Sequence, residues 1–122
     1  MTEETVAGNH IILDLGNGRF ALYAHLQPGS LRVKTGQKVH PGQVIGLLGN
    51  SGNSDLPHLH FQVMNANSPL GSEGLPYVFK SFDVEGKAVI QDILDPGKIW
   101  KPVVPAINRV YEIPFENAII KF

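Results

Sequence analysis

Two histidines, His58 and His60, are separated by one residue in the segment SDLPHLHF, which covers residues 54–61. Alternate side chains of a β-strand point to the same face, so a strand over 58–64 places both imidazoles side by side, with Cα atoms about 6 to 7 Å apart. Leu59 and Phe61 then face a core. Two neighbouring imidazoles can share one metal ion, or can divide into a ligand and an acid–base group. The alternative is a solvent-facing pair of histidines on an edge strand.

Short strands broken by glycine turns must position these histidines. The first half predicts strands at 9–15 and 19–26 around a Gly-Asn-Gly hairpin turn, then very short strands and tight turns over 31–52. The second half predicts two strands joined through Glu85-Gly86, final strands after residue 108, and loops at 65–76 and 95–106. Glycine is too frequent for a long helix. The sequence therefore predicts an all-β fold, a sheet or sandwich of short antiparallel strands with a loop-rich β extension.

The composition suits one globular domain. The 122 residues are 43% hydrophobic and 17% charged, with a formal net charge of -1. Lys and Arg form no cluster, which argues against nucleic-acid binding. The chain has no cysteine, which excludes disulfides, cysteine zinc sites and thiol catalysis. No stretch reaches the roughly 20 apolar residues of a membrane span, and the acidic start MTEETVAG lacks the apolar region of a signal peptide.

A longer pattern contains the two histidines. The segment ALYAHLQPGSLRVKTGQKVHPGQVIGLLGNSGNSDLPHLHFQV places a Tyr-Ala-His-Leu strand, a glycine hairpin, a Gly-Asn-Ser-Gly turn and a Pro-His-Leu-His-Phe strand in order. Over about residues 8–64 the chain resembles the M23 family of zinc metallopeptidases, the lysostaphin-like or LytM-like peptidoglycan endopeptidases. The resemblance implies a LytM-type antiparallel β-fold, related to the barrel-sandwich hybrid. We expect the peptidase core at 1–64 and a β extension at 65–122 packed on the same domain.

The resemblance also implies roles for individual residues. His60 matches a zinc ligand of the family, and His25 and His58 match its two catalytic histidines, which handle protons and stabilise the transition state. Substrate contacts are expected from four residues, Tyr23, Asn50, Ser51 and Asn53. Zinc is the implied cofactor and a peptidoglycan peptide the implied substrate. An extracytoplasmic location is implied as well, with any signal outside this chain.

The zinc site is incomplete in the sequence. The family holds zinc with two His and one Asp, and the missing pair forms an H-x-x-x-D-like motif upstream of the Tyr-Ala-His-Leu strand. His10 and Asp14 have this spacing and could share a strand face, so they are weak metal candidates beside His60. The other interpretation is a partly exposed strand histidine and a turn-initiating aspartate. We expect zinc to be absent or weakly bound, and this chain to be an inactive part of a longer peptidase.

Two other functions stay open. A non-catalytic M23-like module that binds or regulates a cell-wall enzyme would have the same fold without the chemistry. The glycine hairpin also resembles carrier domains, among which a phosphocarrier would use paired histidines, such as His25 with His58 or His60. Zinc content and phosphoryl transfer to histidine separate these functions from the peptidase. Exposed strand edges also allow self-association.

Overall fold

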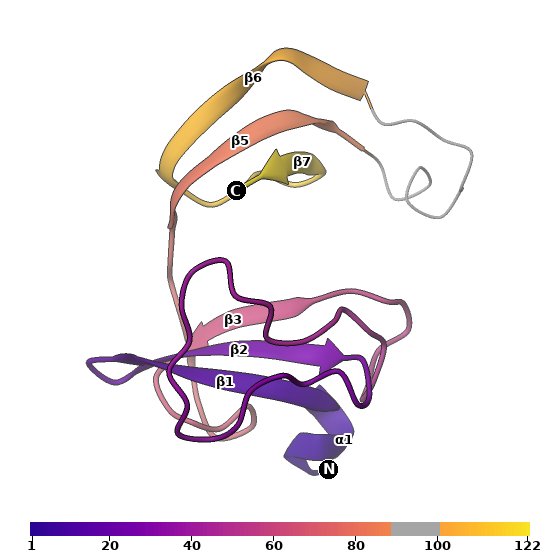
Figure 1. Ribbon diagram of the computed structural model, residues 1–122, viewed down its shortest axis with the longest axis vertical. Helices are drawn as coiled ribbons and strands as arrows, with labels where there is room; N and C mark the ends of the chain where they lie inside the picture. Colours follow the sequence, from indigo (N-terminus) through magenta and orange to yellow (C-terminus); the bar gives the residue numbers. More distant parts are fainter. Residues whose placement is uncertain (89–100) are drawn as a thin grey trace. The chain divides into compact units, whose positions relative to one another are not determined.

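The computed structural model describes residues 1–88 and 101–122 of the chain. Its internal contacts divide the chain into two compact units, Met1–Pro76 and Tyr77–Phe122, which Figure 1 shows coloured along the sequence. The strands described in each unit form an antiparallel sheet. Each unit is described by itself.

The first unit is built on a four-stranded sheet in the order β1-β2-β3-β4. The predicted strands at 9–15 and 19–26 are confirmed, and the strand predicted over 58–64 begins at His60. The elements of this unit are α1 (Glu3–Ala7), β1 (Asn9–Gly16), β2 (Arg19–Leu26), β3 (His60–Met64) and β4 (Gly74–Leu75).

The β1–β2 hairpin turns on Asn17 and Gly18. Both residues have positive φ, 54° and 71°, and Asn-Gly is the pair that adopts such a two-residue turn at least cost. The Asp14 carboxylate accepts a hydrogen bond from the Gly16 backbone N–H at 2.8 Å. The turn therefore fixes the register of β1 on β2, which is the strand that carries His25.

One face of this sheet packs against α1. Residues of β2 on that face alternate along the strand, as expected when one side of a sheet is buried. The core consists of four buried residues and two partly buried ones packed against them, namely Ala7, Leu22, Ala24, Met64, Ile12 and Phe20. The helix begins with a capping box between Thr2 and Thr5. This core anchors the two strands whose ends carry His25 and His60.

The segment between β2 and β3 folds back over the first unit through isolated hydrogen bonds. Arg32, for example, donates its backbone N–H to the Ile45 carbonyl at 2.9 Å. The very short strands predicted over 31–52 do not form ladders, because tight turns with positive φ at Gly36 and Gly42 interrupt the pairing. Two isolated bridges stand in their place, Leu26–Leu48 and Gly49–His58. The second bridge places the backbone of His58 beside the glycine-rich turn, which covers residues 49–53.

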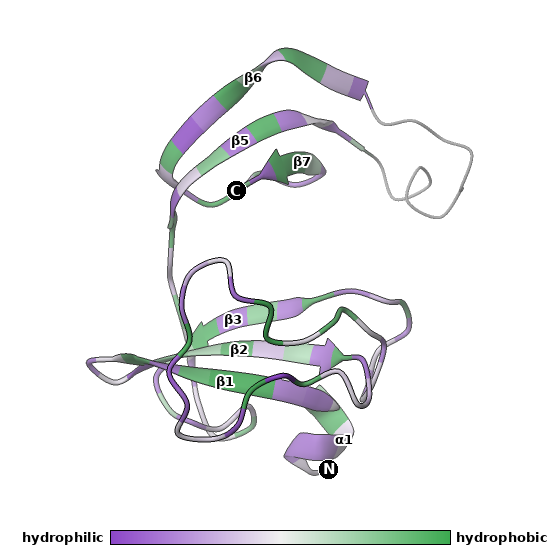
Figure 2. Cartoon of the chain, in the orientation of Figure 1, coloured by the Kyte–Doolittle hydropathy of each residue, from purple (hydrophilic) through white to green (hydrophobic). Residues whose placement is uncertain are grey.

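The second unit contains a three-stranded sheet in the order β6-β5-β7. Phe82 and Val84 of the central strand are buried, and Figure 2 shows hydrophobic residues along β7. The bounds are β5 (Phe79–Lys87), β6 (Lys101–Glu112) and β7 (Ala118–Lys121). The predicted junction between two strands at Glu85-Gly86 is wrong. There β5 continues through a register shift, because a β-bulge accommodates the glycine without ending the strand.

The loop predicted over 95–106 is wrong for residues 101–106, which belong to β6. Pro102 and Pro105 favoured a loop, but β6 pairs only with β5 in the described sheet. Proline is tolerated on such an edge strand, because its missing N–H can face away from the partner. Residues 95–100, and most of the strand predicted at 87–94, lie outside the described residues.

The predicted fold class is confirmed, since both sheets are antiparallel and α1 is the one helix in the described parts of the chain. None of the described residues form a helix long and apolar enough to cross a membrane. The predicted domain boundary after residue 64, and the packing of the extension on the core, stay predictions. By its contacts, the compact first unit extends to Pro76.

Candidate functional site

Three histidines from two segments of the first unit meet at one point. His25 lies near the end of β2, His58 precedes β3, and His60 begins it. One ring nitrogen of each lies within 4.8 Å of the others. The His25 ring centroid is 4.8 Å from that of His58 and 5.6 Å from that of His60. His25 is buried while the other two are exposed, so the cluster has a fixed inner member and an open outer side.

An irregularity in β2 brings His25 to this cluster. The register shifts between Asn9 and Ile11 of β1, so Ala24 and His25 together stand opposite one residue. His25 has a φ of 62°, a left-handed conformation that is uncommon outside glycine. In a regular strand its side chain would point away from the face of Ala24. The bulge turns it onto that face, and Ala24 pairs across the sheet with His60.

Hydrogen bonds set which nitrogen of each ring carries the proton. The Nδ1 of His25 lies 2.8 Å from the Ser51 carbonyl oxygen, and the Nδ1 of His58 lies 2.7 Å from the Leu56 carbonyl oxygen. A carbonyl only accepts hydrogen bonds, so Nδ1 donates in both rings. In the neutral rings this leaves Nε2 of His25 and of His58 with a lone pair, which can take a proton or bind a metal ion.

The glycine-rich turn forms one wall of the cluster and is held by close backbone packing. A Cβ on Gly49 would lie 2.4 Å from the Gln27 nitrogen, and a Cβ on Gly52 would lie 2.4 Å from the Gly8 nitrogen. Ser51 donates its hydroxyl to the Leu26 carbonyl at 2.6 Å. The wall therefore rests directly on the end of β2, where its Ser51 carbonyl holds the His25 ring.

Two of the predicted substrate-binding residues are exposed on this wall. Asn50 accepts a hydrogen bond from the Ser54 hydroxyl at 2.6 Å, and Asn53 donates its backbone N–H to the Val6 carbonyl. Ser51 also lies on the wall, but its hydroxyl bonds inside the protein, donating to Leu26 and accepting from the Asn9 N–H at 2.9 Å. Its described contacts are structural, and its role in substrate binding stays a prediction.

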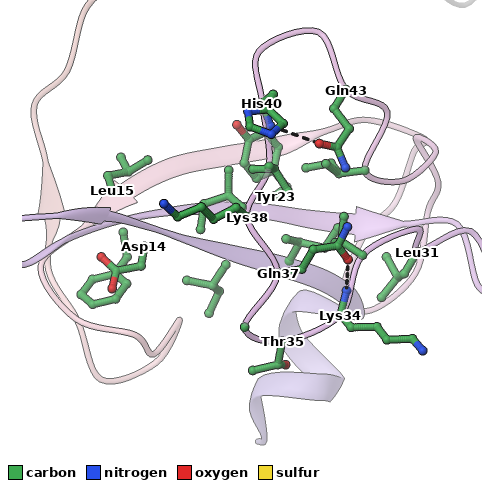
Figure 3. A pocket seen from close by; sticks show the side chains of 18 of the residues that line it. Asp14, Leu15, Tyr23, Leu31, Lys34, Thr35, Gln37, Lys38, His40 and Gln43 are labelled. Carbon is green, nitrogen blue, oxygen red and sulfur yellow. Dashed lines mark hydrogen bonds between the residues drawn. The ribbon is translucent and has the colours of Figure 1, made fainter.

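Tyr23, the fourth predicted substrate-binding residue, lies elsewhere. It lines an open groove of about 1390 Å³ beside β1 and the 31–45 segment, shown in Figure 3, whereas none of the three clustered histidines lines this groove. Its ring packs edge-on against Phe61 with centroids 5.1 Å apart. Burial raises the pKa of the Tyr23 phenol above its ordinary value of 10.0.

Leu59, predicted to face the core, is 44% exposed, because the chain at His58 forms a single bridge rather than a ladder.

His10 and Asp14 are not brought to the cluster. Both line the groove of Figure 3, and neither belongs to the metal-competent group found among the described residues. The Nδ1 of His10 bonds the Gly8 carbonyl at 2.8 Å, and the Asp14 carboxylate caps the hairpin turn. Their joint ligation with His60 stays a prediction. The alternative interpretation, a strand histidine and a turn aspartate, matches the described contacts.

The histidine cluster could hold a metal ion. Three imidazoles with an open fourth position are a donor set used in catalytic zinc sites. Zn–N bonds of about 2.0–2.1 Å bring two ligand nitrogens to about 3.4 Å from each other. The ring nitrogens here lie within 4.8 Å of one another, so small movements of the rings would bring them to that spacing. No carboxylate in the described parts of the chain joins the group.

Two polar residues at the site were missed by the sequence analysis. Gln62 lies with its Oε1 at 2.7 Å from Nε2 of His60, and the Ser54 hydroxyl lies 3.2 Å from Nδ1 of His58. Strand alternation could have found Gln62, because residues i and i+2 share a face. No sequence pattern indicates Ser54, which reaches His58 through an irregular loop.

The fold and the site define a small antiparallel β-domain whose histidine cluster could bind a metal ion. Residues 1–72 match the peptidase family M23. Because this match covers more than half of the chain, the chain belongs to peptidase family M23.

Relatives with curated names support this assignment. The chain is 41% identical over 75 residues to peptidoglycan DD-endopeptidase ShyA of Vibrio cholerae, covering 54% of this chain and 17% of the relative. It is 44% identical over 59 residues to endolysin 2638A of Staphylococcus phage 2638A, covering 46% of this chain and 12% of the relative. For DD-carboxypeptidase/endopeptidase Mpg of Neisseria meningitidis the identity is 36% over 63 residues, covering 52% and 14%.

The matched region is a small part of each relative. The chain spans less than a fifth of the length of these three proteins. No solved structure gives a significant match to the chain.

Proposed function

We propose that this chain carries the catalytic histidines of a zinc-dependent endopeptidase that cleaves peptide cross-links of bacterial peptidoglycan. The observation that supports this most strongly is the convergence of His25, His58 and His60, whose ring nitrogens lie within 4.8 Å of one another. Membership of family M23 and the names of the relatives point to the same chemistry. Those names specify DD-endopeptidases, so a cross-link between two D-configured centres is the proposed substrate.

The three histidines have different proposed roles. His60, at the exposed start of β3, is the proposed zinc ligand. A bound zinc ion would polarise the scissile carbonyl and acidify a water molecule. Nε2 of His25 and of His58 carries the lone pair of the neutral ring, because the Nδ1 atoms donate to backbone carbonyls. We assign to these two lone pairs the role of accepting a proton from the attacking water and, once protonated, stabilising the developing oxyanion.

The wall beside the cluster is the proposed contact surface for the peptide. Asn50 and Asn53 are exposed there, and their amides can both donate to and accept from a peptide backbone. Ser51 contributes by holding the wall and the His25 ring. Tyr23 lines the groove of Figure 3 and would contact only a substrate that extends there.

The donor set within the chain is smaller than the one that the family resemblance implies. That resemblance assigns a second His and an Asp to the zinc, and the described residues bring no carboxylate to the cluster. We therefore expect the 122 residues alone to bind zinc weakly and to cleave peptidoglycan below detection. The missing ligands are proposed to come from further polypeptide in the natural protein.

The test uses the longest natural polypeptide that contains this chain. Purified with zinc, it should release muropeptides from DD cross-links of isolated cell walls, and a chelator should stop the release. His58→Ala should abolish cleavage while zinc stays bound, and His40→Ala, a turn histidine outside the cluster, should leave cleavage unchanged. A natural polypeptide that binds no zinc at micromolar metal would contradict the peptidase function and favour a non-catalytic module.

A phosphocarrier function receives less support. Paired histidines are present, since the His25 and His58 rings are 4.8 Å apart, but the family match is to a peptidase. Transfer of phosphate from a phosphohistidine donor to His25 or His58 would be required to reinstate it.

A further inference from the structure

Gln62 contacts His60 on the same face of β3. The side-chain Oε1 of Gln62 lies 2.7 Å from Nε2 of His60, which is a short distance for a neutral hydrogen bond between nitrogen and oxygen. Gln62 is half-buried, whereas His60 is exposed. Across the sheet Gln62 pairs with Leu22, a core residue. The amide is therefore anchored at the edge of the core while its oxygen reaches an imidazole at the site.

The chemistry of this contact sets the proton on the His60 ring. An amide oxygen only accepts hydrogen bonds, so Nε2 of His60 must donate. In the neutral ring the lone pair then belongs to Nδ1, and this is the nitrogen left to bind a metal ion. We propose that Gln62 is a positioning residue that fixes the tautomer and orientation of His60 for zinc binding through Nδ1. The proposal deepens the proposed function and rests on it for the identity of the metal.

Gln62 differs from the partners of the other two rings. His25 and His58 are held by the carbonyls of Ser51 and Leu56, which belong to the backbone and survive any substitution of those side chains. His60 depends on a side chain, so its partner can be removed or exchanged. Oxygen partners outside the ligand shell commonly change metal affinity by about 10 to 100-fold when they are removed.

Two substitutions of Gln62 test whether its acceptor oxygen or only the shape of its side chain matters to His60. Gln62→Met keeps the length and the half-buried stem but removes the acceptor. Gln62→Glu keeps an acceptor oxygen and adds charge, which should make Nδ1 a stronger donor to the metal. In the longest natural polypeptide that contains this chain, we expect the zinc dissociation constant, measured by chelator competition, to rise about 10-fold or more in Gln62→Met and to return to the wild-type value or below it in Gln62→Glu.

A second readout needs no metal. In ¹⁵N spectra of the metal-free chain at a pH where histidine is neutral, wild-type His60 should show the Nε2–H tautomer. Its two nitrogen shifts should move toward each other in Gln62→Met, because the ring then samples both tautomers, and should return in Gln62→Glu. His10, whose Nδ1 donates to the Gly8 carbonyl at 2.8 Å, is the internal reference and should not move.

The zinc affinity and the His60 nitrogen shifts together distinguish a failure of the proposed function from a failure of the role of Gln62. A natural polypeptide that binds no zinc, with the His60 shifts moving as expected, contradicts the proposed function and leaves the tautomer role of Gln62 supported. Unchanged His60 shifts in Gln62→Met, or zinc affinity within about threefold of wild type, overturn the role of Gln62. Failure of Gln62→Glu to restore the affinity that Gln62→Met loses also overturns it, because a merely structural role does not depend on an acceptor oxygen. Cooperative thermal unfolding of both variants shows that the first unit remains folded.

Discussion

At the scale of single residues, two glycines hold the wall of the histidine cluster against the start of the chain. Gly8 has a φ of 64°, and a Cβ there would lie 2.4 Å from the Ser51 carbonyl carbon. A Cβ on Gly52 would lie 2.4 Å from the Gly8 nitrogen. These contacts are between backbones, which cannot move aside as the end of a flexible side chain can. A methyl group at either position would push the wall away from the His25 ring.

Gly8→Ala should therefore be strongly destabilising. We expect a loss of about 3 kcal/mol in the free energy of unfolding, from left-handed strain and overpacking together. Gly16→Ala is the matched control, because its φ is 83° but no atom lies within 4 Å of its Cβ position. It should lose only about 1–2 kcal/mol. Equal losses in urea denaturation would show that the close approach at Gly8 does not matter.

Tyr23 gives a pH dependence whose sign follows from its environment. Burial raises the pKa of its phenol above 10.0, so the folded chain holds this proton more tightly than the unfolded chain. The resulting stabilisation is fully present below about pH 10 and is lost as the pH rises through the folded pKa. We expect the free energy of unfolding to fall above pH 10 and Tyr23→Phe to flatten that fall. Identical slopes for the two proteins would contradict this assignment.

Sequence reasoning at this scale succeeded where a residue's position follows from alternation and failed where it does not. The one-residue spacing of His58 and His60 predicted neighbouring imidazoles, and both lie in the cluster. The place of His25 follows from a bulge and a φ of 62°, which no pattern of residue types specifies. Only the family resemblance indicated that His25 belongs with the other two.

At the scale of elements, the glycine-rich turn is fastened to β1 and β2 by one hydroxyl. The Ser51 Oγ accepts from the Asn9 N–H at 2.9 Å and donates to the Leu26 carbonyl at 2.6 Å. Its own carbonyl accepts from His25. The position of the turn, the end of β2 and the His25 ring are thus coupled through a single residue.

Ser51→Ala should cost about 1–3 kcal/mol of unfolding free energy, because two partners lose their hydrogen bond in a partly buried place. Ser72→Ala is the control, for which no loss of unfolding free energy is expected. Its hydroxyl oxygen is buried and has no hydrogen-bond partner among the described residues, so its removal should be neutral or slightly stabilising. Calorimetric melting of the two variants measures the difference. A Ser51→Ala chain as stable as wild type would show that the turn is held by packing alone.

Element boundaries were predictable where turn chemistry is strong. Asn17-Gly18 between two alternating segments specified the β1–β2 hairpin. In the second unit Pro102 and Pro105 indicated a loop, yet they lie in β6. Whether a proline ends a strand depends on whether the strand lies at the edge of its sheet, and that is a property of pairing that the local sequence does not contain.

At the scale of the whole molecule, the family resemblance concerns the first unit and says little of the second. The match to family M23 ends at residue 72, and the first compact unit ends at Pro76. No chemical motif was visible beyond that point. The second unit's sheet could be predicted as β-structure from its composition, but β7 pairs with β5 rather than with β6, which precedes it along the chain, and short-range patterns do not reveal this order.

Self-association through strand edges stays a prediction, and β6 is where it can be tested. This strand lies at one edge of the described sheet, and Val110 on it is 54% exposed. We expect the sedimentation mass of the chain to rise with concentration, and Val110→Lys to reduce that rise, because charge on an edge opposes pairing. Val44→Lys, at an exposed position outside the strands, is the control. A mass independent of concentration would contradict the prediction.

The central claim is that His60 is a zinc ligand, and His25 and His58 are catalytic histidines, of a peptidoglycan endopeptidase. Zinc anomalous diffraction from crystals of the natural polypeptide, grown with the metal, tests it most directly. We predict one strong peak at about 2.0–2.1 Å from Nδ1 of His60, with Nε2 of His25 and of His58 facing the open side of the metal. A peak at Nε2 of His60 would contradict the role of Gln62, and a peak away from the cluster, or none at saturating zinc, would contradict the central claim.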